Sequence, residues 1–245
     1  ETLISSTHLI DMEPQEPIEK TGQVRWFKRP TPGMTYLVSL DPAMGTGGDY
    51  AAIQVFELPT FEQVGEWHHN TTPMNQQVRI LQSITKHLHD TIMEKDNTAS
   101  PQIFYSMENN SIGEAALLRV MDIGEENIQG MFLSEPIRKG HRRKFRRGFN
   151  TTAKHKIDAC TKFKELVENN KMKINSHLLI SELKDFVASG MSFSAKAGQH
   201  DDLVSASLLM TRMIKTLADF DPKIFEKWTD RTSELAPMPI YGSFS

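Results

Sequence analysis

The chain has 245 residues, of which 38% are hydrophobic and 24% are charged, an ordinary composition for a globular protein. Its formal net charge of -3 excludes a polycation that binds nucleic acid through overall charge, so such binding would need a local basic patch. The single cysteine excludes an intramolecular disulfide and fits a reducing, intracellular setting, and no apolar run approaches the ~18 residues of a membrane span.

The first third of the chain predicts a lead-in followed by three strands. Residues 1–33 are punctuated by prolines, and only residues 24–27 could pair there as a short strand. Strands are predicted at residues 34–41, 50–57 and 63–69, and the short turns between them indicate an antiparallel meander. The N-terminus has no basic segment typical of a signal peptide and no initiator methionine, so we interpret the chain as a fragment of a longer protein.

The remaining elements alternate between helices and strands. Apolar residues at spacings of three and four predict a helix over residues 74–93, and a short apolar strand follows at 102–107. Ser111 and Glu114 have the spacing of a capping box for the next helix. Further elements are expected at 128–133 (a strand), 151–168 (a helix), 177–194 (a short helix and a broken strand) and 201–218 (a helix). This order predicts an α/β sheet with helices on both faces.

Acidic residues stand at three of these element ends. Asp41 ends the first strand of the meander, directly before a glycine-rich turn at 45–48, and Glu108 ends the fourth strand. Asp201 and Asp202 open the last helix. Ligands bind outside the carboxyl ends of strands in open α/β sheets, so we expect these groups to meet there. Each alone also fits a plain structural role as a turn starter, a solvated loop residue or a helix cap.

A divalent cation would offset the electrostatic repulsion within such a carboxylate cluster. Close carboxylates repel one another, and an ion removes this cost. Mg²⁺ prefers oxygen ligands, and two ions about 3.5–4 Å apart can promote phosphodiester hydrolysis with water as the nucleophile.

A strongly basic segment lies between two of the helices. Seven of the ten residues at 138–147 are Lys or Arg, namely Arg138, Lys139, Arg142, Arg143, Lys144, Arg146 and Arg147. Such a run is solvated, contacts an acidic partner or binds phosphates. We favour phosphate binding, with Phe145 available to stack on a base or to anchor the loop.

Three motifs resemble the nuclease motifs of one viral family. The run at 40–53 resembles the first nuclease motif of tailed-bacteriophage large terminase subunits. Glu108, after the apolar residues 103–107, is similar to their second acidic motif, and residues 200–206 are similar to their third. The resemblance covers roughly residues 34–218 and is strongest to terminases of large contractile-tailed phages.

The resemblance implies an RNase H-like (RuvC/integrase-type) mixed sheet and a Mg²⁺- or Mn²⁺-dependent endonuclease that cuts concatemeric double-stranded viral DNA during genome packaging. Asp41, Glu108 and Asp202 would be the catalytic and metal-binding triad for two ions. Asp49, Asp201 and His200 would be auxiliary residues. The implied partners are DNA, the ATPase motor of the same full-length chain, the portal protein and the small terminase subunit, with no membrane. The implied location is the host cytoplasm, docked transiently at the procapsid portal.

The sequence departs from a full large terminase in one respect. It contains no Gly-Lys-Ser/Thr phosphate loop, so we expect it to lack the motor and to bind no nucleotide. Residues 1–33 would then be the link from the motor, 34–218 the nuclease domain and 219–245 a tail.

Two other functions fit parts of the sequence. The glycine turn also resembles the first phosphate loop of actin-like nucleotide-binding and phosphotransfer proteins, although their second phosphate loop and adenosine motif are missing. A non-catalytic DNA- or portal-binding module is the other alternative.

Overall fold

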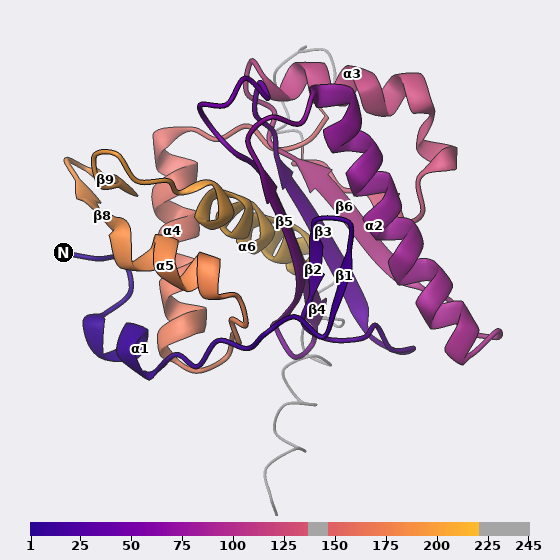
Figure 1. The fold of residues 1–245 in the computed structure, drawn as a ribbon, viewed down its shortest axis with the longest axis horizontal. Coiled ribbons are helices and arrows are strands. Elements are labelled where there is room, and N and C mark those ends of the chain that lie inside the picture. The colour runs from indigo at the N-terminus through magenta and orange to yellow at the C-terminus, as the bar shows by residue number, and fades with distance from the viewer. Residues whose placement is uncertain (137–146, 221–245) are drawn as a thin grey trace, which may run out of the picture.

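The computed structural model describes residues 1–136 and 147–220, and its central feature is a mixed seven-stranded sheet (Figure 1). The strand order is β1-β2-β5-β4-β3-β6-β7. β3 (Thr35–Asp41), β4 (Ala51–Leu58) and β5 (Glu62–His69) form the predicted antiparallel meander. β6 (Gln102–Met107) pairs in parallel with β3, and β7 (Met131–Phe132) pairs in parallel with β6. The predicted mixed α/β sheet is therefore confirmed.

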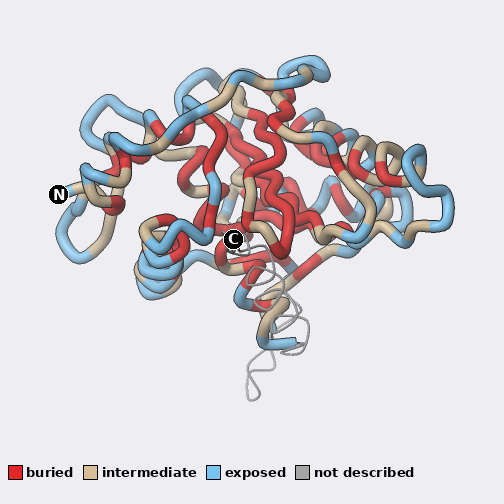
Figure 2. The backbone as a smooth tube through the Cα atoms, turned by 90° about the horizontal axis from the view of Figure 1, so that it is seen from below, coloured by how far each residue is buried: buried red, intermediate tan, exposed pale blue. Residues whose placement is uncertain are grey.

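Helices cover both faces of this sheet, as predicted. α2 (Met74–Lys95) and α3 (Gly113–Ile123) pack on one face, while α4 (Ala153–Glu168), α5 (His177–Asp185) and α6 (Asp202–Phe220) pack on the other (Figure 1). Side chains of β3 alternate between the two layers, so that Leu37 belongs to the core under α6 and Val38 to the core under α2. In Figure 2 the buried residues concentrate along the central strands.

The first 33 residues pack onto this domain. α1 (Ser6–Asp11) is followed by β1 (Glu19–Thr21) and β2 (Val24–Trp26), and β2 pairs antiparallel with β5, which extends the sheet. Leu3, Ile4 and Leu9 are buried in the core under α6. The backbone of Leu3 also donates a 3.0 Å hydrogen bond to Phe186, at the start of the hairpin formed by β8 (Phe186–Ser189) and β9 (Ser192–Ala195).

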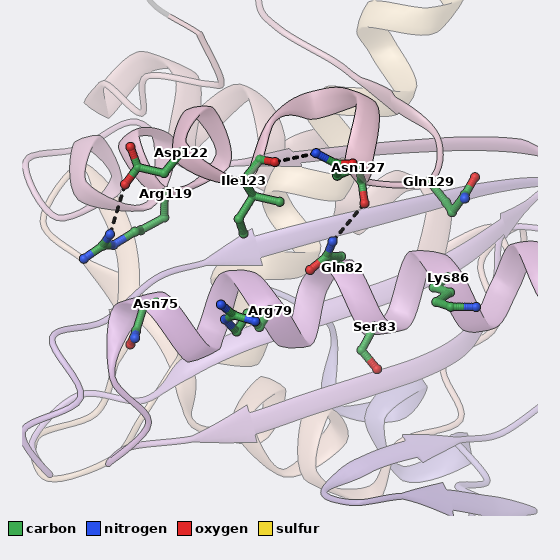
Figure 3. Close-up of a pocket in the computed structure, with 10 residues that line it drawn as sticks. All are labelled: Asn75, Arg79, Gln82, Ser83, Lys86, Arg119, Asp122, Ile123, Asn127 and Gln129. Carbon is green, nitrogen blue, oxygen red and sulfur yellow. Dashed lines mark hydrogen bonds and ion pairs between the residues drawn. The ribbon is translucent and has the colours of Figure 1, made fainter.

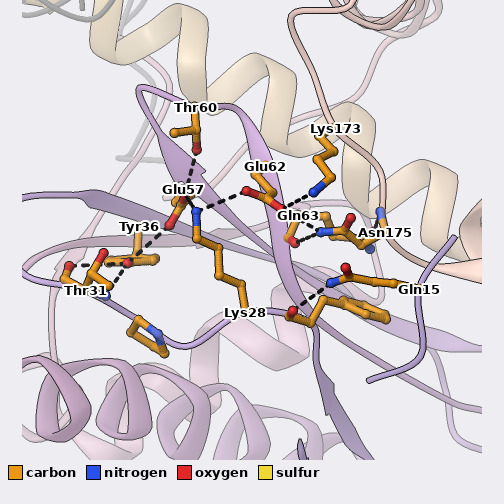
Figure 4. A network of polar contacts seen from close by, with 12 residues as sticks. Gln15, Lys28, Thr31, Tyr36, Glu57, Thr60, Glu62, Gln63, Lys173 and Asn175 are labelled. Carbon is orange, nitrogen blue, oxygen red and sulfur yellow. Dashed lines mark hydrogen bonds and ion pairs between the residues drawn. The ribbon is translucent and has the colours of Figure 1, made fainter. Parts of the chain in front are cut away.

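A polar network fixes the same segment to the sheet (Figure 4). Lys28 forms ion pairs with the buried Glu57 of β4 and with Glu62 of β5. Glu62 also accepts a 2.9 Å hydrogen bond from Lys173. A buried carboxylate such as Glu57 is costly without a partner, so this network stabilises the charge and anchors residue 28.

Three local details differ from the expectations. Ser111 does not cap α3, because the helix begins at Gly113, whose N–H is taken by the Asn110 side chain at 2.7 Å. The strand expected at 128–133 is shortened to β7, because only Met131 and Phe132 pair with β6; the short helix η1 (Glu125–Asn127) precedes it. Residues 42–50 form the loop between β3 and β4, one residue longer than the gap between the two expected strands.

Among residues 1–136 and 147–220, none of the helices combines the length and the apolar character needed to cross a bilayer.

Candidate metal centre

The sheet register brings Asp41 and Glu108 together. β3 and β6 are adjacent and parallel with Leu40 opposite Met107, and the Glu108 N–H donates a 3.1 Å hydrogen bond to the Leu40 carbonyl. Asp41 and Glu108, which follow Leu40 and Met107, therefore lie side by side at the carboxyl edge of the sheet. Burial and the nearby Glu108 carboxylate raise the pKa of Asp41 well above its ordinary value, and Asp202 and Asp201 add to this effect. These acidic groups are thus close enough to influence one another.

Glu108 is held by the turn that leads into α3. The Asn110 amide donates a 3.1 Å hydrogen bond to the Glu108 carboxylate, and its carbonyl oxygen accepts from the Gly113 N–H. Gly113 permits this close approach, because a Cβ there would lie 1.8 Å from the Glu108 carbonyl oxygen. Asn110 therefore links the start of the helix to the orientation of the carboxylate, a role that the sequence reasoning missed.

The two aspartates at the start of α6 have different surroundings. The Asp201 carboxylate accepts a 3.1 Å hydrogen bond from the Ala195 N–H, which ties it to the end of β9. The Asp202 carboxylate accepts a hydrogen bond from the Tyr50 backbone, but its Oδ2 atom is buried with no hydrogen-bond partner among the described residues. Burial and the Asp201 charge raise the pKa of Asp202 to about 6. The Asp202 charge also raises the pKa of Asp41 more than the Asp201 charge does.

Two further residues join Asp202 that the sequence reasoning did not identify. His68 of β5 and Glu182 of α5 place one ligand atom each within 4.8 Å of the Asp202 carboxylate and of each other. Burial raises the pKa of Glu182 to about 8 and lowers the pKa of His68 to about 4. No local motif could reveal them, because they are far apart in the sequence and only tertiary packing brings them together.

The expected auxiliary residues surround Asp202. His200 is exposed, with its Nδ1 atom 3.6 Å from Asp202 Oδ2. Tyr50 stacks on His68 with ring centroids 4.1 Å apart and meets the His200 ring edge-on at 4.9 Å. Asp49 is exposed in the loop before β4, and its charge contributes to the raised pKa of Asp202.

Most of the basic segment lies outside the described residues. This applies to Arg138, Lys139, Arg142, Arg143, Lys144 and Arg146. Arg147 is described and forms an ion pair with Glu125. The backbone before and after the segment is fixed beside Glu108: Asn109 donates a 2.8 Å hydrogen bond to the Arg147 carbonyl, and the Glu135 N–H donates to Gly148 at 3.2 Å. The basic segment therefore leaves and re-enters the described structure next to the acidic edge.

The glycine-rich loop is occupied by protein contacts. The Gly47 N–H donates a 2.9 Å hydrogen bond to the Asn70 carbonyl, and the Asn70 amide donates back to Gly47 at 3.1 Å. Gly45 has a φ of +73°, and a Cβ there would lie 2.3 Å from the Thr72 carbonyl oxygen. These contacts make the loop a support for the 70–73 turn and occupy the Gly47 N–H, which is therefore not available to a phosphate.

A separate groove lies between α2 and α3 (Figure 3). Its volume is about 950 Å³, and it is lined by Asn75, Arg79, Gln82, Ser83, Lys86, Arg119, Asp122, Ile123, Asn127 and Gln129. Arg119 is paired with Asp122 at 2.9 Å, and Lys86 is paired with Asp90. Asp41, Glu108 and Asp202 do not line this groove, so it is distinct from the carboxylate cluster.

Comparisons with known proteins identify the family and the fold of the chain. Residues 38–213 match the family model described as the terminase RNaseH-like domain. The large terminase nuclease of thermophilic phage G20c, solved with bound magnesium, is 16% identical with a TM-score of 0.63, over 86% of this chain and 96% of that chain. The Thermus phage P74-26 large terminase nuclease domain is 17% identical with a TM-score of 0.60, over 85% and 93%.

A terminase nuclease domain from a human virus is also similar, at a lower TM-score and a lower identity. The human cytomegalovirus terminase nuclease domain, soaked with manganese and bound to an inhibitor, is 13% identical with a TM-score of 0.54. It covers 86% of this chain and 94% of that chain. At these identities the structures show a shared fold, and the family match covers most of the chain. The chain therefore belongs to the family described as the terminase RNaseH-like domain.

Proposed function

We propose that this chain is a divalent-metal-dependent endonuclease that cuts concatemeric double-stranded viral DNA during genome packaging. The observation that carries the proposal is the register of β3 and β6, which sets Asp41 beside Glu108 at one sheet edge, with Asp202 at the start of α6 acting on the pKa of Asp41. The family membership and the neighbours solved with magnesium, cobalt and manganese support metal dependence.

The side chains at this edge suit hard cations. Asp41, Glu108 and Asp202 supply carboxylate oxygens, the ligands that Mg²⁺ and Mn²⁺ take up. The partial burial of Asp41, and the burial of an Asp202 Oδ2 atom that has no partner among the described residues, are unfavourable unless a cation or protons neutralise these groups. These residues would hold two ions, with Asp202 rather than Asp201 as the aspartate ligand.

The proposed chemistry divides between the ions and the chain. When bound, the ions would lower the pKa of an attacking water and stabilise the leaving oxygen of the phosphodiester. Asp41 contributes a rigid position, because it ends a strand that is paired on both sides. Asn110 fixes the Glu108 carboxylate, and the backbone of α6 fixes Asp202. The chain thus preorganises ligands that would otherwise repel one another.

The basic segment is proposed to hold the DNA backbone. The described residues that flank it, Glu135 and Arg147, lie beside the turn that carries Glu108. Neutralising Arg142, Arg143 and Arg146 together should weaken DNA affinity and flatten the dependence of log affinity on log salt. The motor of the same full-length chain, the portal and the small terminase subunit remain proposed partners, at the procapsid portal in the host cytoplasm.

A plasmid-nicking assay tests the enzymatic proposal. The wild-type chain should nick supercoiled plasmid in Mg²⁺ or Mn²⁺ and be inactive in EDTA. Asp41→Asn should lose more than about 100-fold in rate, because even the partners that orient metal ligands are worth 10–100-fold. Asp96→Asn is a matched control, since Asp96 follows the far end of α2 and its side chain binds only Thr98 among the described residues. A wild-type chain that binds DNA without cutting it would favour the non-catalytic module instead.

A further inference from the structure

A row of residues crosses the sheet from the proposed nuclease centre to β5. Asp41 of β3 pairs with Ala52 of β4, which in turn pairs with His68 of β5. Directly opposed residues point to the same face, so Asp41 and His68 both face the α5–α6 layer. Two strand spacings separate them, roughly 9–10 Å. The small Ala52 between them leaves this face of the sheet open to side chains from the helices.

Glu182 and Asp202 approach His68 from those helices. The Val204 N–H donates a 3.0 Å hydrogen bond to Glu182 Oε2, which joins α5 to the first turn of α6. The other carboxylate oxygen, Oε1, lies 3.6 Å from His68 Nε2. That distance is too long for a hydrogen bond. It is close to the roughly 3.4 Å between two ligand atoms on one tetrahedral ion with ~2.1 Å bonds.

Three buried atoms at this point have no hydrogen-bond partner among the described residues. They are His68 Nε2, Glu182 Oε1 and Asp202 Oδ2, and they lie within 4.8 Å of one another. The Glu182 side chain is only 10% exposed, so water reaches it poorly. Buried polar atoms are normally paired, and three orphans that converge on one point indicate a missing common partner. All three can donate a lone pair, which makes a cation the fitting partner.

We infer that His68, Glu182 and Asp202 form a binding site for a divalent transition-metal ion, separate from the Asp41–Glu108 position. One imidazole nitrogen and two carboxylate oxygens favour Zn²⁺, Mn²⁺ or Co²⁺ over Mg²⁺, which prefers oxygen ligands alone. Tyr50 holds the imidazole in place by stacking on it at 4.1 Å. The site shares Asp202 with the nuclease centre proposed above, but its existence does not require that the chain cuts DNA.

Because Asp202 belongs to both sites, an ion at this site should affect the proposed nuclease centre. An ion on His68 and Glu182 would fix the Asp202 carboxylate on the side that faces β5, away from β3. Occupancy of this site therefore sets the orientation of a ligand of the nuclease centre. We accordingly expect Zn²⁺ to change the concentration of Mg²⁺ needed for nicking, an effect that Glu182→Gln should abolish.

Calorimetric titration of the whole chain with Zn²⁺, in buffer without Mg²⁺, tests the assignment. The wild type should show one site that Glu182→Gln and His68→Gln weaken at least about 100-fold. That site should survive in the double variant Asp41→Asn/Glu108→Gln. His69→Gln is the matched control, because the adjacent His69 ring points to the opposite face of β5 and binds Thr72 at 2.6 Å.

Histidine-ring NMR gives an independent readout on the wild-type protein, which keeps the test decisive if a variant misfolds. The ¹⁵N resonance of His68 Nε2 should shift on addition of Zn²⁺ and stay unchanged on addition of Mg²⁺ alone. The inference is overturned if His68 does not respond to Zn²⁺, or if folded Glu182→Gln and His68→Gln variants bind Zn²⁺ like the wild type. These results are independent of nicking, so a failed nuclease proposal and a failed metal site are distinguishable.

Discussion

At the scale of single residues, the proposed ligands are placed where they weaken the metal-free fold. Asp41 is partly buried beside Glu108, and desolvation together with that like charge raises the pKa of Asp41 well above its ordinary value. Such groups are retained at functional sites because the ligand that they bind offsets the cost. Neutralising Asp41 should therefore raise the stability of the metal-free protein and lower the activity of the metal-bound protein.

Asp41→Asn should thus stabilise the protein in EDTA while it removes activity. We expect the Tm to rise by about 2–4 °C, the shift that about 1 kcal/mol produces in a chain of this size. Saturating Mg²⁺ should raise the Tm of the wild type, relative to EDTA, by more than it raises the Tm of the variant. Differential scanning fluorimetry measures both quantities. A variant that melts below the wild type in EDTA would contradict the claim that repulsion dominates at this position.

Asn110→Ala tests a residue that orients a ligand without touching the ion. The substitution removes the 3.1 Å contact to Glu108 and the bond to the Gly113 N–H, so nicking should slow by about 10–100-fold. The free energy of unfolding should fall by only about 1 kcal/mol, the usual worth of a helix cap. Asn127→Ala, which removes a similar 2.7 Å side-chain bond to Ile123 at the far end of α3, is the control. Equal activities of the two variants would remove Asn110 from the site.

The sequence could identify some of these residues and not others. Asp41 and Glu108 stood out because each follows an apolar run that is long enough to be a buried strand. His68 did not, because it lies in a strand whose facing cannot be read without its register. Glu182 lies in a short helix whose docking depends on α6. Of the two aspartates, only the structure shows that Asp201 is tied to β9.

At the scale of elements, the long buried strands and the amphipathic helix α2 were the predictable ones. The observed bounds of β3, β4, β5, β6 and α2 differ from the predicted ranges by at most two residues, because the strands are continuous runs that are mostly buried and α2 has a regular helical period. Short elements such as β7 and the β8–β9 hairpin depend on tertiary pairing, which local sequence does not encode. The cap of α3 was misassigned because the Asn110 side chain, and not that of Ser111, binds the N–H of Gly113.

Gly113→Ala tests how closely α3 is fitted to the end of β6. The added Cβ would lie 1.8 Å from the Glu108 carbonyl oxygen, so either the helix start or Glu108 has to move. We expect a lower Tm and a slower nicking rate, with the Mg²⁺ concentration for half-maximal rate raised. Gly48→Ala is the control for stability, because a Cβ there meets no atom within 4 Å. A Gly113→Ala protein with unchanged metal dependence would show that α3 does not position Glu108.

At the scale of the whole molecule, the cluster couples stability to pH. The raised pKa of Glu182, about 8 against an ordinary 4.5, means that the folded state holds a proton that the unfolded state releases. This contribution lowers stability as pH rises towards 8. His68 acts in the opposite direction, but only between about 4 and 6.5, because its folded pKa is lowered. Above pH 6.5 the loss due to Glu182 is no longer opposed by His68.

The metal-free protein should therefore melt at progressively lower temperature as pH is raised from 6.5 to 8. Each pH unit is worth at most about 1.4 kcal/mol for one proton, or roughly 3–5 °C in a chain of this size. Glu182→Gln should flatten the slope, whereas Glu165→Gln, a change at an exposed glutamate of α4, should leave it intact. Thermal melts in EDTA across this range measure it. A wild-type Tm that rises between pH 6.5 and 8 would contradict the account of a buried, protonated Glu182.

The overall sheet topology could be predicted from the sequence, whereas the packing of the first 33 residues could not. The order of elements and the handedness of crossovers restrict the sheet to few topologies, so the mixed sheet with helices on both faces followed from chain order alone. The packing of residues 1–33 onto β5 and under α6 did not follow, because their short segments gain stability only from contacts with the rest of the domain.

The central claim is that Asp41, Glu108 and Asp202 together hold divalent cations. Crystals of the wild-type chain soaked in Mn²⁺, measured at a wavelength where manganese scatters anomalously, test this most directly. The account predicts an anomalous peak that contacts the Asp41 and Glu108 carboxylates, with Asp202 as a ligand of the same centre. Ordered side chains at these three positions with no anomalous peak between them, at a Mn²⁺ concentration that supports nicking, would contradict it.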